Sequence, residues 1–349
     1  MILRTLKWLG LTLGLVVLAA VLFVWWAAGG QTDTSPVSLS RVENLPDAPA
    51  AADPDATLDR LTVMTFNIGY GRGPAGDLSG PWTRDHVLRH LDGLASQIAA
   101  SGADVAALQE VDLASARSHD IDEGRYLRDK LGWAGLTCSV TWENNYVPFP
   151  YWPPSRHYGR MKSGQCVLSR WPIGAATRYR MEKPANNPFF RNWFYLDRAI
   201  DHVVIPVGGR ELHVFNVHLE AFDATSRAAQ AARLVALVNA EPSPLTVILG
   251  DFNALPPGVT PRSGFPDEPD ITYDDDSVAV VAAAPGLSEV LLDADGVVTH
   301  PADAPNRRLD YIFHRAGLVE QSARVLSEPP VWSDHLPVVA RFTVAPAGS

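Results

Sequence analysis

The feature that most constrains the fold is the stretch from Val247 to Asn253, VILGDFN, which two prolines at positions 256 and 257 follow. Three apolar residues that suit a fully buried strand lead into Gly250, and the chain then presents Asp251 and Asn253. Proline cannot continue a strand because it lacks a backbone N–H. A buried strand therefore delivers a carboxylate and a carboxamide to its carboxyl edge. The tripeptide Asp-Phe-Asn is also typical of a simple Asx turn, so the other strand ends must decide between the two interpretations.

Polar side chains also end two strands in the first half of the chain. The alternating, β-rich segment 61–68 predicts a strand that ends near Asn67. A helical period over 83–101 follows, and then a short apolar strand over 104–111 that ends in Glu110. A helix between two strands implies a crossover within one sheet. We therefore expect Asn67 and Glu110 at the same edge of that sheet.

The second half of the chain repeats this arrangement. Segments 199–207 and 211–219 flank a Gly-Gly pair and predict a hairpin, and the helix predicted over 225–240 leads into the VILGDFN strand. His218 closes the second hairpin strand, whereas His213 is expected to be a surface residue. Eight polar residues thus lie at or near strand ends: Asn67, Glu110, His218, Asp251, Asn253, Asp310, Asp334 and His335.

The chemistry of these residues indicates an enzyme. Strands that alternate with helices and carry polar groups at their ends are typical of α/β enzymes. The oxygens of Asp, Glu and Asn suit Mg²⁺ or Mn²⁺, and the sequence has no Cys/His cluster with zinc spacing. Histidines beside acids can move protons near neutral pH. The 349 residues carry a formal net charge of -10, which argues against a general nucleic-acid binder unless a divalent metal offsets it.

The amino terminus predicts a membrane segment. Trp8 to Ala28 is an uncharged, apolar run long enough to span a bilayer, and Arg4 and Lys7 before it favour a cytoplasmic amino terminus. Residues 1–30 are therefore interpreted as an uncleaved anchor, with a cleaved signal peptide as the alternative. Both interpretations export the rest of the chain. Residues 31–58, rich in Pro, Ala, Ser, Thr and Asp, are expected to be a flexible linker to a domain over 59–349.

Three further segments leave alternatives open. Cys138 and Cys166 could form a disulfide in an oxidising compartment or remain buried thiols. The run from Trp142 to Pro154, WENNYVPFPYWPP, is not expected to be a regular strand or helix; it could pack on its own domain, form a substrate wall or touch a bilayer. A helix is expected near 278–292, after an acidic run at 274–276 that most simply solvates a loop.

Seven segments, taken in order, resemble the endonuclease/exonuclease/phosphatase superfamily, which includes DNase-like nucleases, neutral sphingomyelinases and inositol-polyphosphate phosphatases. They span about 280 residues of the chain. The matching segments are TFNI at 65–68, LQEV at 108–111, LSRWPI at 168–173, NVHLE at 216–220, GDFN at 250–253, RLDYIF at 308–313 and SDHLPV at 333–338. The resemblance implies a four-layer α/β sandwich, in which two packed mixed sheets are flanked by helices, and metal-dependent hydrolysis of phosphoesters.

The resemblance also implies a metal site for Mg²⁺ or Mn²⁺. At matching positions, Glu110 would be the main ligand, with Asn67 and Asp334 near it. A bound dication would neutralise the substrate phosphate, so an acidic protein could still hydrolyse an anion.

The remaining matched positions imply catalytic roles. Asp251 would align or deprotonate the attacking water, and Asn253 would hold a phosphate oxygen. His335, oriented by Asp310, would stabilise charge in the transition state together with His218. One departure concerns the acid that orients the second histidine in DNase-like members. The local sequence here leaves open whether Asp197 takes that part or whether Arg198 contacts phosphate.

These features lead to one preferred function and two alternatives. We expect a membrane-anchored, extracytoplasmic phosphoester hydrolase that acts on a phosphodiester or a phospholipid head group. An extracytoplasmic nuclease is the first alternative; nucleic acid is a possible but not a favoured substrate because Lys and Arg are scarce. A non-catalytic lipid- or protein-binding domain is the second alternative. No protein partner is evident from the sequence.

Overall fold

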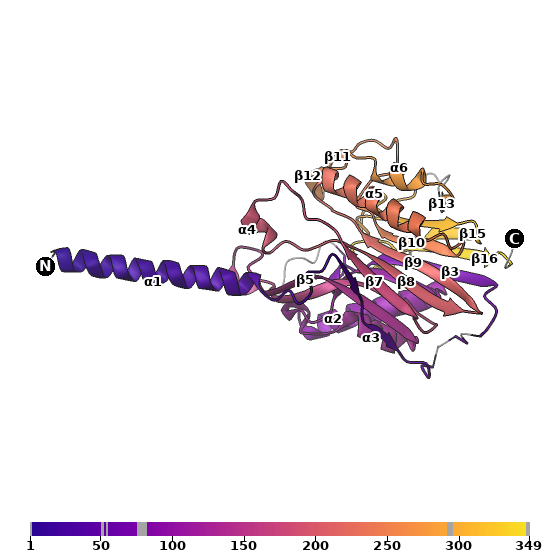
Figure 1. Ribbon diagram of the computed structural model, residues 1–349, viewed down its shortest axis with the longest axis horizontal. Helices are drawn as coiled ribbons and strands as arrows, with labels where there is room; N and C mark the ends of the chain where they lie inside the picture. The colour runs from indigo at the N-terminus through magenta and orange to yellow at the C-terminus, as the bar shows by residue number, and fades with distance from the viewer. Residues whose placement is uncertain (1, 50–51, 54, 75–81, 292–295, 347–349) are drawn as a thin grey trace.

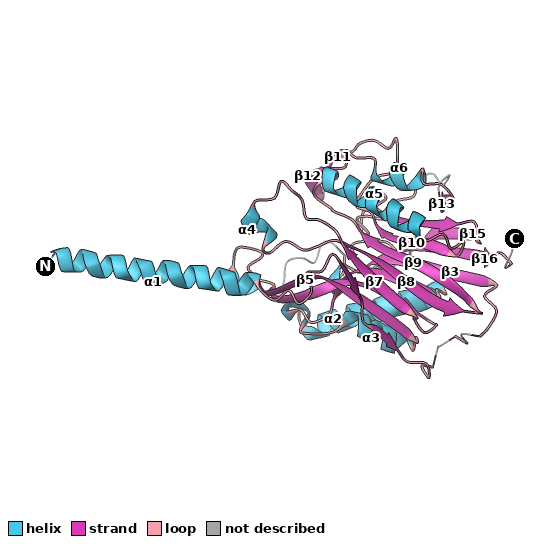
Figure 2. Ribbon diagram, viewed as in Figure 1, coloured by secondary structure: helices cyan, strands magenta, loops and turns pink. Residues whose placement is uncertain are grey.

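The structure is a computed structural model that describes residues 2–49, 52–53, 55–74, 82–291 and 296–346. Two seven-stranded mixed sheets form its centre (Figures 1 and 2). The first sheet has the strand order β1 (Val37–Leu39), β7 (Ala175–Arg180), β8 (Ala199–Val207), β9 (Arg210–His218), β10 (Thr246–Asp251), β14 (Asp310–Arg315) and β13 (Leu287–Glu289). The second has the order β15 (Leu318–Val325), β16 (Val338–Val344), β3 (Arg60–Asn67), β4 (Val105–Asp112), β6 (Gly159–Ser169), β5 (Gly135–Val147) and β2 (Val42–Asn44).

Helices cover the outer faces of both sheets, as Figure 2 shows. Helices α2 (Arg84–Ser101) and α3 (Glu123–Leu131) pack on the second sheet, and α5 (Ala224–Ala240) and α6 (Ser277–Ala282) pack on the first. Three apolar clusters separate the layers, and the middle one lies between the two sheets. This arrangement confirms the expected four-layer α/β sandwich.

Strand pairing brings the polar strand ends together. Strands β3 and β4 are parallel, and so are β9 and β10, in a register that pairs Asp251 with His218. Strand β14 runs antiparallel to β10 and pairs Asp310 with the same Asp251. Gly250 permits this close pairing, because a Cβ there would lie 2.1 Å from the carbonyl oxygen of Val217. The predicted strand-end site therefore forms at one edge where both sheets meet.

Several local expectations differ from the structure. Residues 31–58, expected to be a linker, contribute strands β1 and β2, one to the edge of each sheet. Strand β5 continues to Val147, so the first part of the aromatic run is regular. The helix expected near 278–292 is confined to Ser277–Ala282, and β13 follows it; residue 292 lies outside the described range. The edge strands β1, β2 and β13 have three residues each, and they are ordered by pairing with segments that are distant in the sequence or by a short local pattern that is hard to recognise.

The remaining part of the aromatic run is irregular, as predicted. A 3₁₀ turn at Pro154–Arg156 ends it, and the short helix α4 (Phe189–Asn192) lies in the second aromatic segment. A small hairpin of β11 (Ser263–Phe265) and β12 (Glu268–Thr272) interrupts the loop before α6. In the acidic run, Asp275 is not simply solvated: its carboxylate accepts hydrogen bonds from the buried Arg227, at 2.6 and 2.8 Å.

The first helix, α1 (Ile2–Ala28), projects away from the domain (Figure 1). Within the described part of the chain it is the helix with the length and apolar composition needed to cross a membrane. Its carboxyl end is joined to β5, because the Asn145 backbone N–H donates to the carbonyl of Gly29 at 2.7 Å and the Asn145 side chain donates to the carbonyl of Trp26 at 2.9 Å. The end of α1 is therefore held against β5.

The two cysteines form a disulfide, which resolves the alternative left open by the sequence. Cys138 on β5 and Cys166 on β6 are directly opposed in the antiparallel ladder and are bonded to each other. Gly124 of α3 packs against the bond, where an added Cβ would lie 2.9 Å from the sulfur of Cys166. The bond therefore joins two strands beneath the helix that covers them.

A buried polar cluster links the two sheets in the interior. Gln109 of β4 donates to the side-chain oxygen of Asn216 on β9 at 2.7 Å, and Gln165 of β6 donates to Asp201 of β8 at 2.9 Å. Burial raises the pKa of the Asp201 carboxyl to about 7, although Ser139, Gln165 and Arg178 favour its charged form. The buried surroundings therefore favour the protonated, neutral form of the Asp201 carboxyl.

The titration of Asp201 predicts a pH-dependent stability. The folded-state pKa of Asp201, about 7, lies above the ordinary value of 3.8. The contribution of Asp201 to the free energy of unfolding is therefore fully present below pH 4 and is lost as the pH rises to 7. The loss corresponds to about 4 kcal/mol of unfolding free energy. Asp201→Asn should therefore flatten the pH dependence of the urea midpoint between pH 4 and 8 and raise that midpoint at pH 8. Asp270→Asn, at an exposed carboxylate on β12, is the control and should leave the profile unchanged.

Candidate active site

Asp251 lies at the centre of the site, at the last position of β10. Its carboxylate accepts hydrogen bonds from the Asn67 side chain at 3.0 Å and from the Asn253 backbone N–H at 2.9 Å. The Nε2 atoms of His218 and His335 lie 3.5 and 3.7 Å from Oδ2 of Asp251, the oxygen that accepts from Asn67. Burial raises the pKa of Asp251 to about 7, against the opposing effect of His335. A carboxylate with this pKa is suited to accept and release a proton near neutral pH.

His335 and Asp310 form a hydrogen-bonded dyad beside Asp251. The Nδ1 atom of His335 lies 2.9 Å from an oxygen of Asp310. The Thr299 hydroxyl accepts the backbone N–H of Asp310 at 3.2 Å, which fixes the start of β14. Burial opposes the charge on His335, but Asp310 and Asp251 outweigh it and raise the pKa of His335 well above its ordinary value. The ring is therefore an imidazolium that can donate from Nε2 at neutral pH.

Glu110 occupies an irregular position near the end of β4. Its φ of +54° lies in the left-handed region, which non-glycine residues rarely adopt, and the ladder to β6 is interrupted between Leu108 and Val111. The irregularity turns the carboxylate toward the site, where it lies 4.0 Å from His218 Nε2 and 3.9 Å from an Arg72 nitrogen. Strain of this kind costs about 1–3 kcal/mol and is common at functional sites.

Asn67 and Asp334 lie on the other side of the site. The Asn67 side-chain oxygen accepts the Gly69 backbone N–H at 3.0 Å, and the Ser333 hydroxyl donates to the Asn67 carbonyl at 2.7 Å. The same hydroxyl lies 3.1 Å from an Asp334 oxygen. Gly69 has no room for a side chain, since a Cβ would lie 2.7 Å from that oxygen. The turn after β3 is thus shaped around the Asp334 carboxylate.

His218 and Asn253 complete the predicted set. Burial, together with the charges of Arg198 and His335, lowers the pKa of His218 well below its ordinary value, so the ring is neutral. Asn253 has a φ of +49°, and its side-chain nitrogen donates to the carbonyl of Leu219 at 3.0 Å. Both residues are buried and both lie beside Asp251. The structure therefore gathers all eight predicted site residues at one edge.

The question left open about Asp197 and Arg198 has a geometric answer. Asp197 accepts two hydrogen bonds from Arg180, at 2.8 and 3.0 Å, and lies 3.4 Å from Lys183, so it belongs to a separate ion-pair group. Arg198 is only 6% exposed, and its Nε lies 3.8 Å from Glu220 without a hydrogen-bond partner among the described residues. Arg198, unlike Asp197, is one of the charges that lower the pKa of His218.

Three further residues belong to the site but were not predicted to do so. Arg72, from the loop after Asn67, is the cation nearest to Glu110. The His300 ring packs on the His335 ring with centroids 4.5 Å apart, and burial lowers the pKa of His300 to about 3. Tyr70 lies under the Arg117 guanidinium, 3.8 Å from its ring centroid. Tyr70 and Arg72 follow the predicted strand end at Asn67 and could have been found from that position, whereas His300 lies outside the named strands, with no strand end to mark it.

The donor set fits a hard divalent cation. Burial and the nearby Asp334 raise the pKa of Glu110, and its cationic neighbour Arg72 stays at 3.9 Å, outside hydrogen-bond distance. Among the described residues no cation is hydrogen-bonded to Glu110, and two neighbouring carboxylates of this kind are well suited to bind a divalent ion. Glu110, Asp334 and the Asn67 side-chain oxygen would supply oxygen ligands. Asp251, Asp310 and His335 also place one donor atom each within 4.8 Å of one another, so they are a second candidate group.

Comparison with known proteins relates this geometry to a family. Residues 64–335 match the model of the Endonuclease/Exonuclease/phosphatase family, and that range contains every residue of the site. No curated protein matches the chain by sequence.

Solved structures share the fold at low sequence identity. A protein from Beutenbergia cavernae described as endonuclease/exonuclease/phosphatase is 21% identical, with a TM-score of 0.56 and coverage of 83% of this chain and 72% of that one. A mannosyl-6-phosphatase of Bacteroides thetaiotaomicron is 14% identical, with a TM-score of 0.57 and coverage of 81% and 99%. The human Nocturnin catalytic domain is 19% identical, with a TM-score of 0.56 and coverage of 88% and 97%.

Proposed function

This chain belongs to the endonuclease/exonuclease/phosphatase family of phosphoester hydrolases, and on that premise we propose that it hydrolyses phospholipid head groups at the membrane to which it is anchored. The proposed reaction depends on Mg²⁺ or Mn²⁺, and the proposed location of the catalytic domain is outside the cytoplasm. The observation that carries the proposal is a group of exposed aromatic side chains between the end of α1 and the candidate active site. We call this group the aromatic rim. It consists of Phe149, Tyr151, Trp152, Phe189, Phe190 and Trp193.

The aromatic rim is exposed to an unusual degree. Tyr151, Trp152 and Phe189 are 81%, 78% and 70% exposed. Exposed apolar patches of this kind mark surfaces that contact a partner or a membrane. Tyr and Trp in particular favour the interface between water and lipid, because each ring has an apolar body and a polar edge.

The rim is attached to the end of the membrane-spanning candidate α1. The Asn144 side chain donates to the carbonyl of Ala28 at 3.0 Å and to the carbonyl of Trp193 at 2.9 Å, so one amide joins helix and rim. Phe23 of α1 packs on Tyr146, with ring centroids 5.8 Å apart. Figure 1 shows α4, which carries two rim residues, beside the end of α1. A bilayer around α1 would thus lie next to the rim.

The rim also connects to the candidate active site. The Trp142 indole N–H donates to the carbonyl of Phe194 at 3.0 Å, and the Tyr195 hydroxyl donates to Glu220, two residues after His218. On the other side, the Arg117 guanidinium lies 5.6 Å from the Trp142 ring and 3.8 Å from that of Tyr70. These contacts join Phe194 and Tyr195, which directly follow the rim residue Trp193, and Trp142 of β5 to two sides of the site, which supports a substrate that reaches the site past the rim.

Export of the domain is supported by two independent features. Arg4 and Lys7 precede the apolar run, and positive charge favours the cytoplasmic side. The Cys138–Cys166 disulfide is typical of proteins in oxidising compartments. An extracytoplasmic domain would reach the outer surface of the membrane that holds α1.

In the proposed mechanism, each site residue has a separate role in phosphoester hydrolysis. A divalent cation held by Glu110, Asp334 and Asn67 would neutralise the phosphate and stabilise charge on its oxygens. Asp251 aligns a water molecule and accepts its proton, for which a pKa near 7 is well matched.

The remaining side chains stabilise the transition state. The His335 imidazolium, held by Asp310, donates from Nε2 to an oxygen on which negative charge develops. Neutral His218, whose Nε2 lies 3.5 Å from Asp251, and Asn253, two residues after Asp251, would hold the phosphoryl oxygens around the reacting water. Arg198 adds a fixed positive charge behind His218.

The direct test is hydrolysis by the full chain in detergent micelles or vesicles. Substrates would be phospholipid, bis-p-nitrophenyl phosphate and plasmid DNA, each with Mg²⁺, Mn²⁺ or EDTA. We expect cation-dependent release of the lipid head group, faster than cleavage of DNA. Faster cleavage of DNA would favour the nuclease alternative, and no hydrolysis of any substrate would contradict the proposal.

Substitutions in the aromatic rim test whether the rim contributes to binding of the membrane rather than to the hydrolysis step itself. Tyr151→Ser/Trp152→Ser should reduce hydrolysis of phospholipid in vesicles at least about 10-fold, because a desolvated aromatic side chain at an interface contributes more than 1 kcal/mol. Hydrolysis of soluble bis-p-nitrophenyl phosphate should stay unchanged. Val319→Ser, at a half-exposed position on β15, is the matched control and should affect neither substrate. Equal losses on both substrates would show that the rim has no special role at the membrane.

A further inference from the structure

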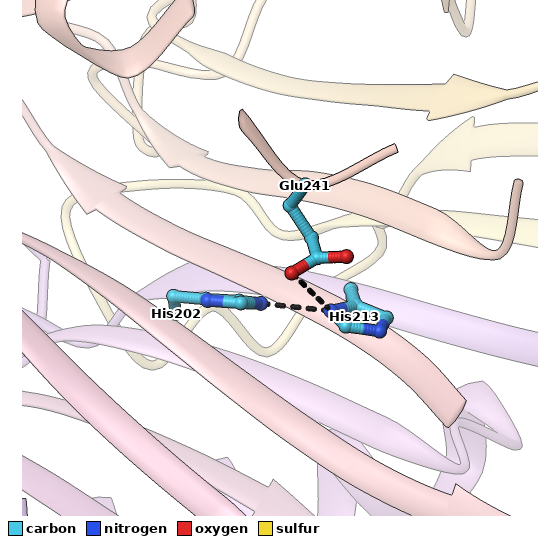
Figure 3. A group of neighbouring side chains, drawn as sticks. All are labelled: His202, His213 and Glu241. Atoms are coloured by element: carbon cyan, nitrogen blue, oxygen red, sulfur yellow. Dashed lines mark hydrogen bonds and ion pairs between the residues drawn. The ribbon is translucent and has the colours of Figure 1, made fainter. Parts of the chain in front are cut away.

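We propose that His202, His213 and Glu241 form a second metal site, for Zn²⁺ or a chemically similar divalent transition ion, at the end of the first sheet opposite the active site. His213 was expected to be a surface residue, but it is 5% exposed. Its Nδ1 lies 2.9 Å from Nε2 of His202 and 3.8 Å from a carboxylate oxygen of Glu241. Figure 3 shows the three side chains converging on this atom.

Three separate elements position the ligands. His202 is on β8 and His213 is on β9, and both side chains lie on the outer face with Phe215, on which the His202 ring stacks at 4.4 Å. Glu241 is the residue that ends α5. His213 and His218 are five residues apart on one strand, which is about 16 Å at ~3.3 Å per residue. The proposed site is therefore distinct from the active site.

The donor atoms match the spacing of a metal site. Ligand atoms of a tetrahedral ion lie about 3.3 Å apart when each bond is about 2.0 Å. The observed separations of 2.9 and 3.8 Å lie on either side of this value, and all three atoms lie within 4.8 Å of one another. Two imidazoles and a carboxylate suit zinc, whereas Mg²⁺ prefers all-oxygen sites.

The surroundings also favour metal binding. The His202 ring is held by its stacking on Phe215, with Nε2 facing His213, so this ligand is already in position. The other ring nitrogen of His213, Nε2, lies 3.9 Å from a carboxylate oxygen of Glu211. Metal-bound histidines often have a carboxylate partner at this second nitrogen.

An open hollow gives an ion access to the proposed site. It has a volume of about 370 Å³, and Glu211, His213 and Glu241 lie along it. Arg210 also lines the hollow, but its guanidinium donates to the carbonyl of Ala345 at 2.8 Å. The hollow has space for water as a further ligand.

The test uses the full chain in detergent micelles with Glu110→Ala as background, because that change should weaken cation binding by Glu110 and Asp334. Asp251, Asp310 and His335 are unchanged in every variant, so any Zn²⁺ bound there is the same in all of them. After chelator treatment, calorimetric titration with Zn²⁺ should show one tight equivalent at the proposed site, and Co²⁺ bound there should give the visible absorption of a tetrahedral complex. Both signals should be lost in Glu110→Ala/His213→Ala. Glu110→Ala/Glu241→Gln, at a partly exposed helix end, should retain the fold and bind at least about 10-fold more weakly.

Controls distinguish this site from the active site and from nonspecific binding. Glu110→Ala/His119→Ala, which removes an exposed histidine, should bind Zn²⁺ as the background does. His213→Ala alone should keep its Mg²⁺-dependent hydrolysis. Equal Zn²⁺ binding by the background and by both site variants would overturn the proposal, whether or not the chain hydrolyses phosphoesters.

Discussion

Glu110→Gln should lower the rate of phosphoester hydrolysis by at least about 10³-fold, which is the largest single effect we expect. The substitution keeps the size of the side chain but removes the negative charge that would hold the cation. Burial and Asp334 both raise the pKa of Glu110, so the charge is costly to the fold when no cation is bound. Glu110→Gln should therefore melt at the same temperature as the wild type in EDTA, or higher.

The contrast between activity and stability is the informative measurement. Mg²⁺ should raise the melting temperature of the wild-type chain but not that of Glu110→Gln, because ligand binding stabilises only a protein that binds it. Glu182→Gln, at an exposed position, is the matched control and should resemble the wild type in both assays. Retention of activity by Glu110→Gln would remove this residue from the site, whereas a much lower melting temperature in EDTA would indicate a structural role.

Asp310→Asn should lower activity by about 10²–10⁴-fold, the second largest expected effect. Asp310 holds the His335 ring through a 2.9 Å contact and is the first of the anions that raise the pKa of that ring. Its neutralisation removes stabilisation of the imidazolium, so the pKa of His335 must fall. The protonated ring is then lost at a lower pH, and the alkaline limb of the pH–rate profile should move toward acid.

This shift in the profile separates the proposed role from simple damage to the fold. His335→Gln should lose a similar factor in rate but should lack the alkaline limb that belongs to His335, because no titrating ring remains. Asp303→Asn, at an exposed residue in the preceding loop, should keep both the rate and the profile. An unshifted alkaline limb in Asp310→Asn would contradict the assignment of that limb to His335.

The sequence predicts the central architecture well because the signals there are local. The helical period over 83–101 gives α2, and the Gly-Gly pair gives the turn between β8 and β9. The apolar run of each central strand is long enough to be recognised in the sequence, and a polar residue marks the end of the strand. Prediction fails where pairing partners are distant: β1 pairs with β7 and β2 pairs with β5, whereas the composition of residues 31–58 predicted a linker.

The sequence by itself determined eight candidate side chains that the structure gathers at one edge, because strand ends and ordered motifs mark them one at a time; it did not mark Arg72, Tyr70 or His300. The tertiary structure alone decided how those side chains act, since their charge states depend on burial and on neighbours from other strands. His335 is charged and His218 is neutral although both are buried histidines beside Asp251. His213 shows the same limit: its alternation on β9 is visible in the sequence, but its contact with His202 and its position near Glu241 exist only because three separate elements meet there.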